Sequence, residues 1–140
     1  MSNFIQITPF LSVLDLPATL VFFRDILGFQ IIVNAPGYAY IERETVAIRL
    51  MQNELAAPPA THEQQRAANP TAPLRDYRRF AAYIDVRNVD ALFAELKPKL
   101  DTLPKDHVHA PVNQPYGQRE FMVLAPGNFI LAFGQAISNS

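Results

Sequence analysis

The stretch "FLSVLDLPATLVFFRDILGF", residues 10–29, decides the fold because a strand pattern, a helix start and a glycine stop follow one another in it. Four apolar side chains recur at helical spacing, at Leu16, Leu20, Phe23 and Leu27. Pro17 suits the first turn of a helix, and Gly28 is placed to end it. The stretch therefore predicts a strand that runs directly into a short amphipathic helix.

The strand pattern begins before this stretch and covers residues 4–14. One face of the alternation is expected to join the core, with Ile5, Ile7, Pro9, Leu11 and Val13. The other face is mixed and suits the wall of a cavity, with Phe4, Gln6, Thr8, Phe10 and Ser12. Pro9 lacks an N–H for a strand ladder, so it belongs at an edge or a bulge.

The remainder of the first half contains three β-like runs, at residues 29–34, 38–43 and 46–51. The predicted order of the first half is therefore βαβββ. Residues 53–76 follow with four prolines and almost no periodic apolar pattern. This composition predicts a proline-rich linker or long excursion.

The pattern then begins again at "YIDVRNVDALFAEL", residues 83–96, where a strand feeds a helix that starts after Asn88 and meets Pro98 near its end. Three more β-like runs follow, "DHVHA", "REFMVLA" and "NFILAFG". A repeat of half the chain indicates a duplicated supersecondary unit. We predict an α+β domain with one module in residues 1–52, the linker in 53–76 and a second module in 77–140, whose mixed sheets form a half-barrel cleft.

Composition excludes several classes of function. The chain has 140 residues, a formal net charge of −1 and no cysteine, so disulfides, thiolate nucleophiles and cysteine-ligated metals are excluded. Lys and Arg are scattered, which argues against a nucleic acid partner. Residues 1–6 do not resemble a targeting signal, and no apolar run approaches the ~20 residues of a membrane span. A cytoplasmic protein without a membrane partner is expected.

A resemblance to a known family is carried by four segments: residues 10–29, "AIRLMQ" at 47–52, residues 83–96 and "GQREFMVLAPGNFILAF" at 117–133. In these segments the sequence resembles the glyoxalase, bleomycin-resistance and extradiol-dioxygenase superfamily, also called the vicinal oxygen chelate family, and within it the bleomycin-resistance proteins. The resemblance implies paired βαβββ modules and a homodimer with ligand sites in crevices between subunits. The family's usual Asp-Pro-x-Gly-Asn turn is here the shorter "LAPGN", which lacks the aspartate.

The resemblance also bears on metal binding. The positions that supply metal ligands in metal-dependent members fall on Thr8, Arg49, Ala81 and Leu131, and none of these is a plausible ligand. We therefore expect no metal and no cofactor. A weaker alternative is a displaced metal site at His107 and His109, which stand two apart in a strand pattern and so share a face.

The expected cleft is rich in aromatic side chains, which bind flat rings by stacking and cations over the ring face. The candidate ligand-binding residues of this kind are Phe10, Tyr38, Tyr40, Tyr83, Phe129 and Phe133. Each of these could equally belong to the core. Arg49 and Asp85 complete the set, and because a buried unpaired charge is costly they should pair with each other, with Glu120 or with a polar group of a ligand.

The predicted function is metal-free binding, without turnover, of a small aromatic or heteroaromatic compound, such as an antibiotic or toxic metabolite, in the cleft of a homodimer. The alternative is a lyase, isomerase or dioxygenase that uses the displaced metal site or a general base such as Asp85 or Glu120. A third possibility is a domain that binds a protein partner. Fold alone does not choose among them.

Overall fold

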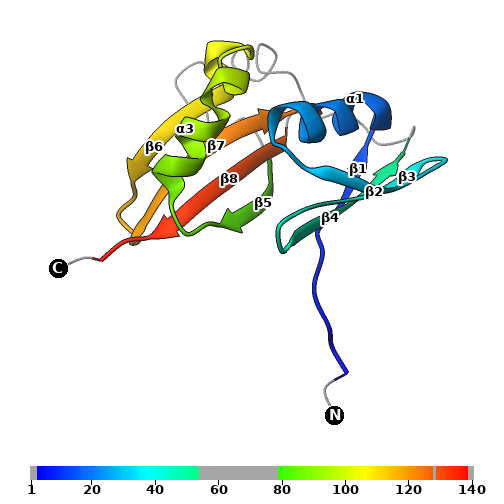
Figure 1. Ribbon diagram of the computed structural model, residues 1–140, viewed down its shortest axis with the longest axis horizontal. Helices are drawn as coiled ribbons and strands as arrows, with labels where there is room; N and C mark the ends of the chain where they lie inside the picture. Colours follow the sequence, from blue (N-terminus) through cyan, green and yellow to red (C-terminus); the bar gives the residue numbers. More distant parts are fainter. Residues whose placement is uncertain (1–2, 54–78, 128, 139–140) are drawn as a thin grey trace.

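The computed structural model describes residues 3–53, 79–127 and 129–138, which form two four-stranded mixed sheets (Figure 1). The first sheet has the strand order β1-β4-β3-β2 and contains β1 (Phe10–Val13), β2 (Gln30–Ala35), β3 (Tyr38–Arg43) and β4 (Val46–Gln52). The second has the order β5-β8-β7-β6 and contains β5 (Arg79–Asp85), β6 (Val108–Asn113), β7 (Gln118–Ala125) and β8 (Phe129–Ala136). The expected linker, apart from Asn53, lies outside the described residues. The predicted α+β class and the two βαβββ units are confirmed.

One main helix covers each sheet, as Figure 1 shows. In the first unit, α1 (Leu16–Val21) continues into a π-helical turn, η1 (Phe22–Ile26), and in the second, α3 (Val89–Leu100) is followed by the short 3-10 turn η3 (Lys105–His107). Pro98 lies within α3, which ends only at Leu100, because a proline in the last turn removes a single backbone bond. In the described part of the chain, no helix is long and apolar enough to cross a membrane.

The two units repeat each other in side-chain detail. The carboxylate of Asp15 accepts a hydrogen bond from the amide of Ala18 at 3.0 Å, and the side chain of Asn88 does the same for the amide of Ala91 at 3.0 Å. Each helix start also has a glutamine partner: Gln52 accepts from Leu16 N at 3.1 Å, and Gln135 accepts from Val89 N at 2.9 Å. The duplication therefore preserves the connection from strand to helix in both halves.

The first sheet buries one face against its helix and leaves the other face open, whereas the second sheet has buried residues on both faces. In the first sheet, the buried side chains Ala39, Ile41, Ile48 and Leu50 are all 0% exposed. In the second sheet, Phe121, Val123 and Leu131 are 0% exposed on the corresponding face. Both sets join a single hydrophobic cluster. Alternation places Phe10, Tyr38, Tyr40 and Arg49 on the opposite face of the first sheet, which we call the first open face. The opposite face of the second sheet, which we call the second open face, is exposed at Phe80 and Tyr83, by 57% and 43%, while Glu120, Ile130 and Ala132 on it are 4% exposed or less.

The first strand is shorter than the sequence pattern predicts. Strand pairing begins at Phe10, and Ile5 and Ile7, expected in the core, are 95% and 96% exposed. This expectation was wrong because no other described element covers that side of the N-terminal arm, residues 3–9, which extends away from the fold (Figure 1). The arm still meets the sheet at its end, where the carbonyl of Pro9 accepts from Arg49 N at 2.9 Å.

Candidate functional site

The first open face gathers four of the predicted ligand-binding residues. The strand register sets Phe10 of β1 and Tyr40 of β3 beside Arg49 of β4, from opposite sides. Tyr38 lies on the same face, and its ring meets that of Phe10 edge-on with centroids 6.2 Å apart. Phe10 is 54% exposed, so the cluster is open to solvent. Its residues come from three adjacent strands, which hold them in fixed relative positions.

Arg49 is the centre of this cluster. Its Nε donates to the Thr8 hydroxyl at 3.0 Å, and its Nη1 donates to the Tyr38 hydroxyl at 2.6 Å. The guanidinium carbon lies 4.8 Å from the centroid of the Tyr40 ring, within the range of a cation–π contact. Within the described residues, Arg49 forms no ion pair with Asp85 or Glu120. The sequence left open whether Arg49 pairs with an acid or with a ligand, and in the described part of the chain its charge has no carboxylate partner.

The second open face carries Tyr83, whose position depends on Gly134. A Cβ added at Gly134 would fall 1.7 Å from the Tyr83 hydroxyl oxygen, so only glycine leaves room for this arrangement. The Tyr83 hydroxyl donates to Gln118 Oε1 at 3.1 Å. Partial burial, together with the neighbouring Glu120 carboxylate, raises the pKa of Tyr83 above its usual range. Tyr83 is therefore neutral at physiological pH and available as a hydrogen-bonding aromatic.

Glu120 is a buried carboxylate on this face. It is 1% exposed and lies opposite Gly134 in the strand register. The Tyr116 hydroxyl donates to its Oε1, whereas its Oε2 has no hydrogen bond to any described residue. Tyr116 is 63% exposed and was missed at the sequence level, because it stands in the turn before β7 and adds to no periodic pattern. The second open face thus combines two tyrosines with an acceptor.

The substitution Gly134→Ala tests the arrangement of Tyr83. We expect the variant to fold normally, because the strand backbone accepts alanine and the clash involves the end of a movable side chain. The tyrosine ring should swing away from Gln118, which a changed Tyr83 ring environment in NMR spectra would report. Ala47→Gly, on β4 of the first sheet, is the control and should leave those signals in place. Unchanged Tyr83 signals in Gly134→Ala would contradict the described packing.

The other predicted ligand-binding residues lie elsewhere. Phe133 is buried on the helix-facing side of β8, where it stacks on Phe121 with centroids 4.8 Å apart. Phe129 shares this side by alternation and is partly buried against the core. Asp85 is exposed at the end of β5. The structure therefore does not bring these three together with the first open face, and their role as ligand contacts stays a prediction.

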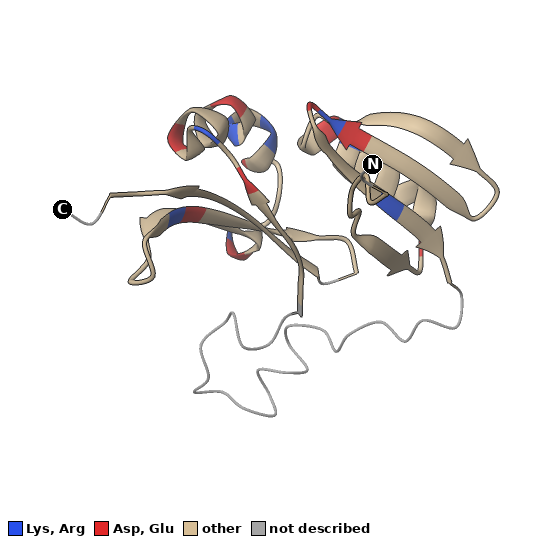
Figure 2. Cartoon of the chain, turned by 90° about the horizontal axis from the view of Figure 1, so that it is seen from below, with Lys and Arg blue, Asp and Glu red and all other residues tan. Residues whose placement is uncertain are grey.

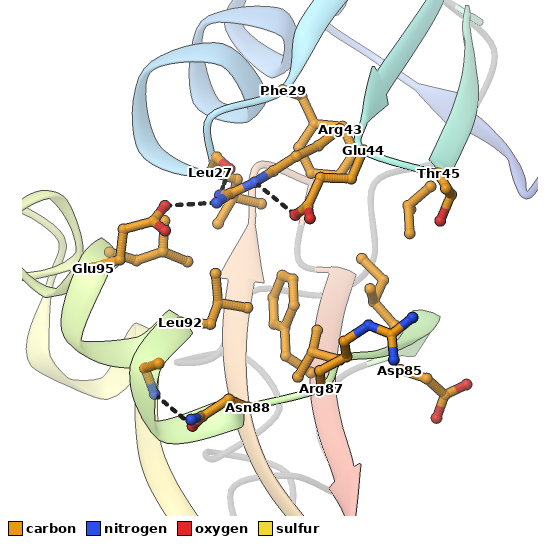
Figure 3. A pocket seen from close by; sticks show the side chains of 16 residues that line it. Leu27, Phe29, Arg43, Glu44, Thr45, Asp85, Arg87, Asn88, Leu92 and Glu95 are labelled. Atoms are coloured by element: carbon orange, nitrogen blue, oxygen red, sulfur yellow. Dashed lines mark hydrogen bonds and ion pairs between the residues drawn. The ribbon is translucent and has the colours of Figure 1, made fainter.

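Asp85 and Phe133 instead line a pocket at the junction of the two units, with a volume of about 540 Å³ (Figure 3). Its walls come from the β3–β4 turn, the β5–α3 connection and α3. At one end, Arg43 donates to the Leu27 carbonyl at 2.8 Å and to Glu95 Oε2 at 2.6 Å. This ion pair joins the first unit to α3 of the second.

The positions considered for a metal do not form a ligand set in the described structure. Thr8 and Arg49 contact each other, and Leu131 is 0% exposed within the core. His107 belongs to η3, with its Nε2 3.9 Å from an Asp106 carboxylate oxygen, while His109 lies on β6. Residues 3–53, 79–127 and 129–138 contain no group of three or more His, Asp or Glu side chains that could hold a metal ion.

Comparison with known proteins decides the family. The model of the glyoxalase/bleomycin resistance protein/dioxygenase superfamily matches residues 5–133. The chain belongs to this superfamily. Among curated superfamily members, a bleomycin resistance protein of Geobacillus stearothermophilus is 26% identical over 141 residues, which cover 96% of this chain and 99% of the relative. A bleomycin resistance protein of Staphylococcus aureus shows the same identity and coverage.

Two solved structures of other proteins share the fold. The bleomycin-binding protein from bleomycin-producing Streptomyces verticillus, complexed with copper(II)-bleomycin, has a TM-score of 0.66 and 24% identity, covering 99% of this chain and 100% of that one. A glyoxalase-related enzyme from Clostridium phytofermentans has a TM-score of 0.68 and 17% identity, and the match covers 97% of this chain and 98% of that one. The predicted vicinal oxygen chelate fold is confirmed. Because binders and enzymes share it, the choice between these functions rests on the site.

Proposed function

We propose that this protein binds a small aromatic or heteroaromatic compound, an antibiotic or other toxic metabolite, and sequesters it without turnover. The observation that carries the proposal is the first open face, where Phe10, Tyr38 and Tyr40 surround the fixed guanidinium of Arg49. Aromatic rings held by adjacent strands offer stacking surfaces for a planar ligand at little entropic cost. The relatives named as bleomycin resistance proteins support a role in antibiotic binding.

In this proposal a second copy of the chain completes the cleft. Phe4, Ile5 and Ile7 of the N-terminal arm are at least 95% exposed, and the open faces add Phe10 and Tyr83 at 54% and 43%. Exposed apolar surface of this extent is typical of an interface. Figure 2 shows few charged residues along the strands of the two sheets, which suits contact with another protein surface. Burying both the arm and the open faces would enclose a ligand between two copies.

The double substitution Ile5→Asp and Ile7→Asp tests this dimer. We expect the wild-type chain to sediment as a dimer at micromolar concentration and the variant as a monomer, because two carboxylates would have to be desolvated at the interface. Val21→Asp, on α1 and 48% exposed, is the control and should stay dimeric. A monomeric wild-type chain, or a dimeric double variant, would contradict the proposed interface.

Binding itself is tested by a thermal-shift screen with bleomycin and planar aromatic antibiotics. A ligand present at about 100 times its Kd adds about 2.7 kcal/mol to the free energy of unfolding, which raises Tm measurably. Mass spectrometry of the compound after prolonged incubation separates sequestration from turnover. Recovery of the compound unchanged supports the proposal, and a new product contradicts it.

A second candidate function, metal-free catalysis with Glu120 as general base, is favoured by one observation. The buried Glu120 carboxylate keeps one oxygen without a hydrogen-bond donor in the described structure, beside Tyr83. An oxygen of this kind is free to accept a proton from a substrate that displaces Tyr116. If a product forms in the incubation above, Glu120→Gln should abolish its formation while binding persists. Equal product formation by this variant would exclude the role.

A further inference from the structure

The arginines of the described structure differ in their partners. Arg24, Arg43 and Arg119 each contact a carboxylate, those of Asp25, Glu95 and Asp90 respectively, at 3.0 Å or less. Arg49 is partly buried, yet its three contacts, with Thr8, Tyr38 and the Tyr40 ring, are all with neutral groups. Glu42 shares the strand face of Tyr40, but no ion pair joins it to Arg49 in the described part of the chain. The positive charge of Arg49 is thus held in place without a counter-charge there.

The three hydroxyl groups around Arg49 all accept a hydrogen bond. Those of Thr8 and Tyr38 act as acceptors toward Arg49, and that of Tyr40 accepts from Gln6 Nε2 at 3.2 Å. A hydroxyl that accepts a hydrogen bond still has its own proton to donate. No described residue accepts from any of these three hydroxyls. The first open face therefore presents unused O–H donors beside the unused N–H groups of the guanidinium.

We infer that the first open face binds an anionic group, and that the ligand is an aromatic carboxylate. The guanidinium Nη2 and the Tyr38 and Thr8 hydroxyls supply donors for the two carboxylate oxygens, and donors to an ionised acceptor make the stronger hydrogen bonds. The aromatic part of the ligand lies against Phe10 and Tyr40. This inference rests on the proposed function and specifies in addition that the ligand carries a negative charge. The long-range field of the protein, with a net charge of −1, opposes such an anion only weakly.

A matched pair of probes tests the inference. 2-Naphthoate and 2-naphthamide share one ring system and differ in charge at the group that would meet Arg49. We expect the wild-type protein to bind 2-naphthoate at least ten times more tightly than 2-naphthamide in calorimetric titrations at low salt. Amide chemical shifts of Thr8, Tyr38 and Arg49 should move with 2-naphthoate. Added salt should reduce the preference.

Three variants test whether Arg49 is responsible for the preference for 2-naphthoate. Arg49→Gln should bring the two affinities within about two-fold of each other, because the fixed charge is lost while hydrogen-bonding capacity remains. Arg49→Lys should retain part of the preference, since it keeps a positive charge but lacks the planar set of N–H donors of the guanidinium. Arg87→Gln changes the net charge equally at an exposed residue of the β5–α3 connection and should leave the preference intact.

Each contrary result has a distinct meaning. Equal binding of both probes by the wild-type protein overturns the inference and leaves aromatic binding standing. A preference for 2-naphthoate that survives in Arg49→Gln also overturns it, because the anion is then held elsewhere. Binding of neither probe overturns the inference and counts against the proposed function as well. Circular dichroism of each variant confirms that the compared proteins are folded.

Discussion

Replacing Phe121 with alanine is expected to lower the free energy of unfolding by about 3–5 kcal/mol, the range for removing a buried phenylalanine. Phe121 is 0% exposed, stacks on Phe133 at 4.8 Å and meets the Phe93 ring of α3 at 5.1 Å. Its loss would leave a cavity between the second sheet and its helix. Urea denaturation followed by circular dichroism measures the change.

The matched control is Phe80→Ala, because Phe80 is 57% exposed at the start of β5. Little apolar area is removed from water at that position, so the loss of stability should be less than about 1 kcal/mol. A similar loss in both variants would contradict the description of Phe121 as a centre of the core.

The largest effect on binding is expected for the combined substitutions Phe10→Ala and Tyr40→Ala. Aromatic contacts contribute about 0.5–1.5 kcal/mol each beyond their buried area, and truncating a ring also removes that area. Two rings together should therefore cost about 2–3 kcal/mol, which weakens binding ~30–150-fold. Isothermal titration calorimetry with a ligand from the screen measures the change.

The single variants and a control complete this test. Tyr40→Ala also removes the surface on which Arg49 stacks, so the two single effects need not add up to the double effect. Val21→Ala, on α1, should bind as the wild-type protein does. A double variant with unchanged affinity would show that the ligand binds somewhere other than the first open face.

Much of the fold followed from local sequence signals. The helix start after Asn88 and the alternation in β3 and β4 act over a few residues, so their structure could be predicted without knowledge of the tertiary fold. The alternation also predicts that Tyr38 and Tyr40 share a face of their strand, and in the structure Tyr40 pairs with Arg49 of β4. The pairing of β3 with β4 is local, because the two strands are near neighbours in the sequence, whereas the role of these residues in ligand binding stays a prediction.

The remaining features depend on contacts between distant segments. Phe133 was expected to line the cleft with Tyr83, but β8 pairs with β5 so that Ala132 lies opposite Tyr83 and Phe133 turns toward the helix. Tyr116 lies in a turn, where no periodicity marks it. Ile5 and Ile7 alternate as core residues do, yet the side chains that would cover them are absent from the described chain, which is why we assign that role to a second copy.

The most direct test of sequestration is a titration of the wild-type protein with bleomycin and the aromatic compounds of the screen, followed by recovery of each bound compound. The proposed function predicts saturable binding of at least one of them, one molecule per chain, with release of the unchanged compound on denaturation. Absence of binding throughout the set, or recovery of a chemically altered compound, would contradict it.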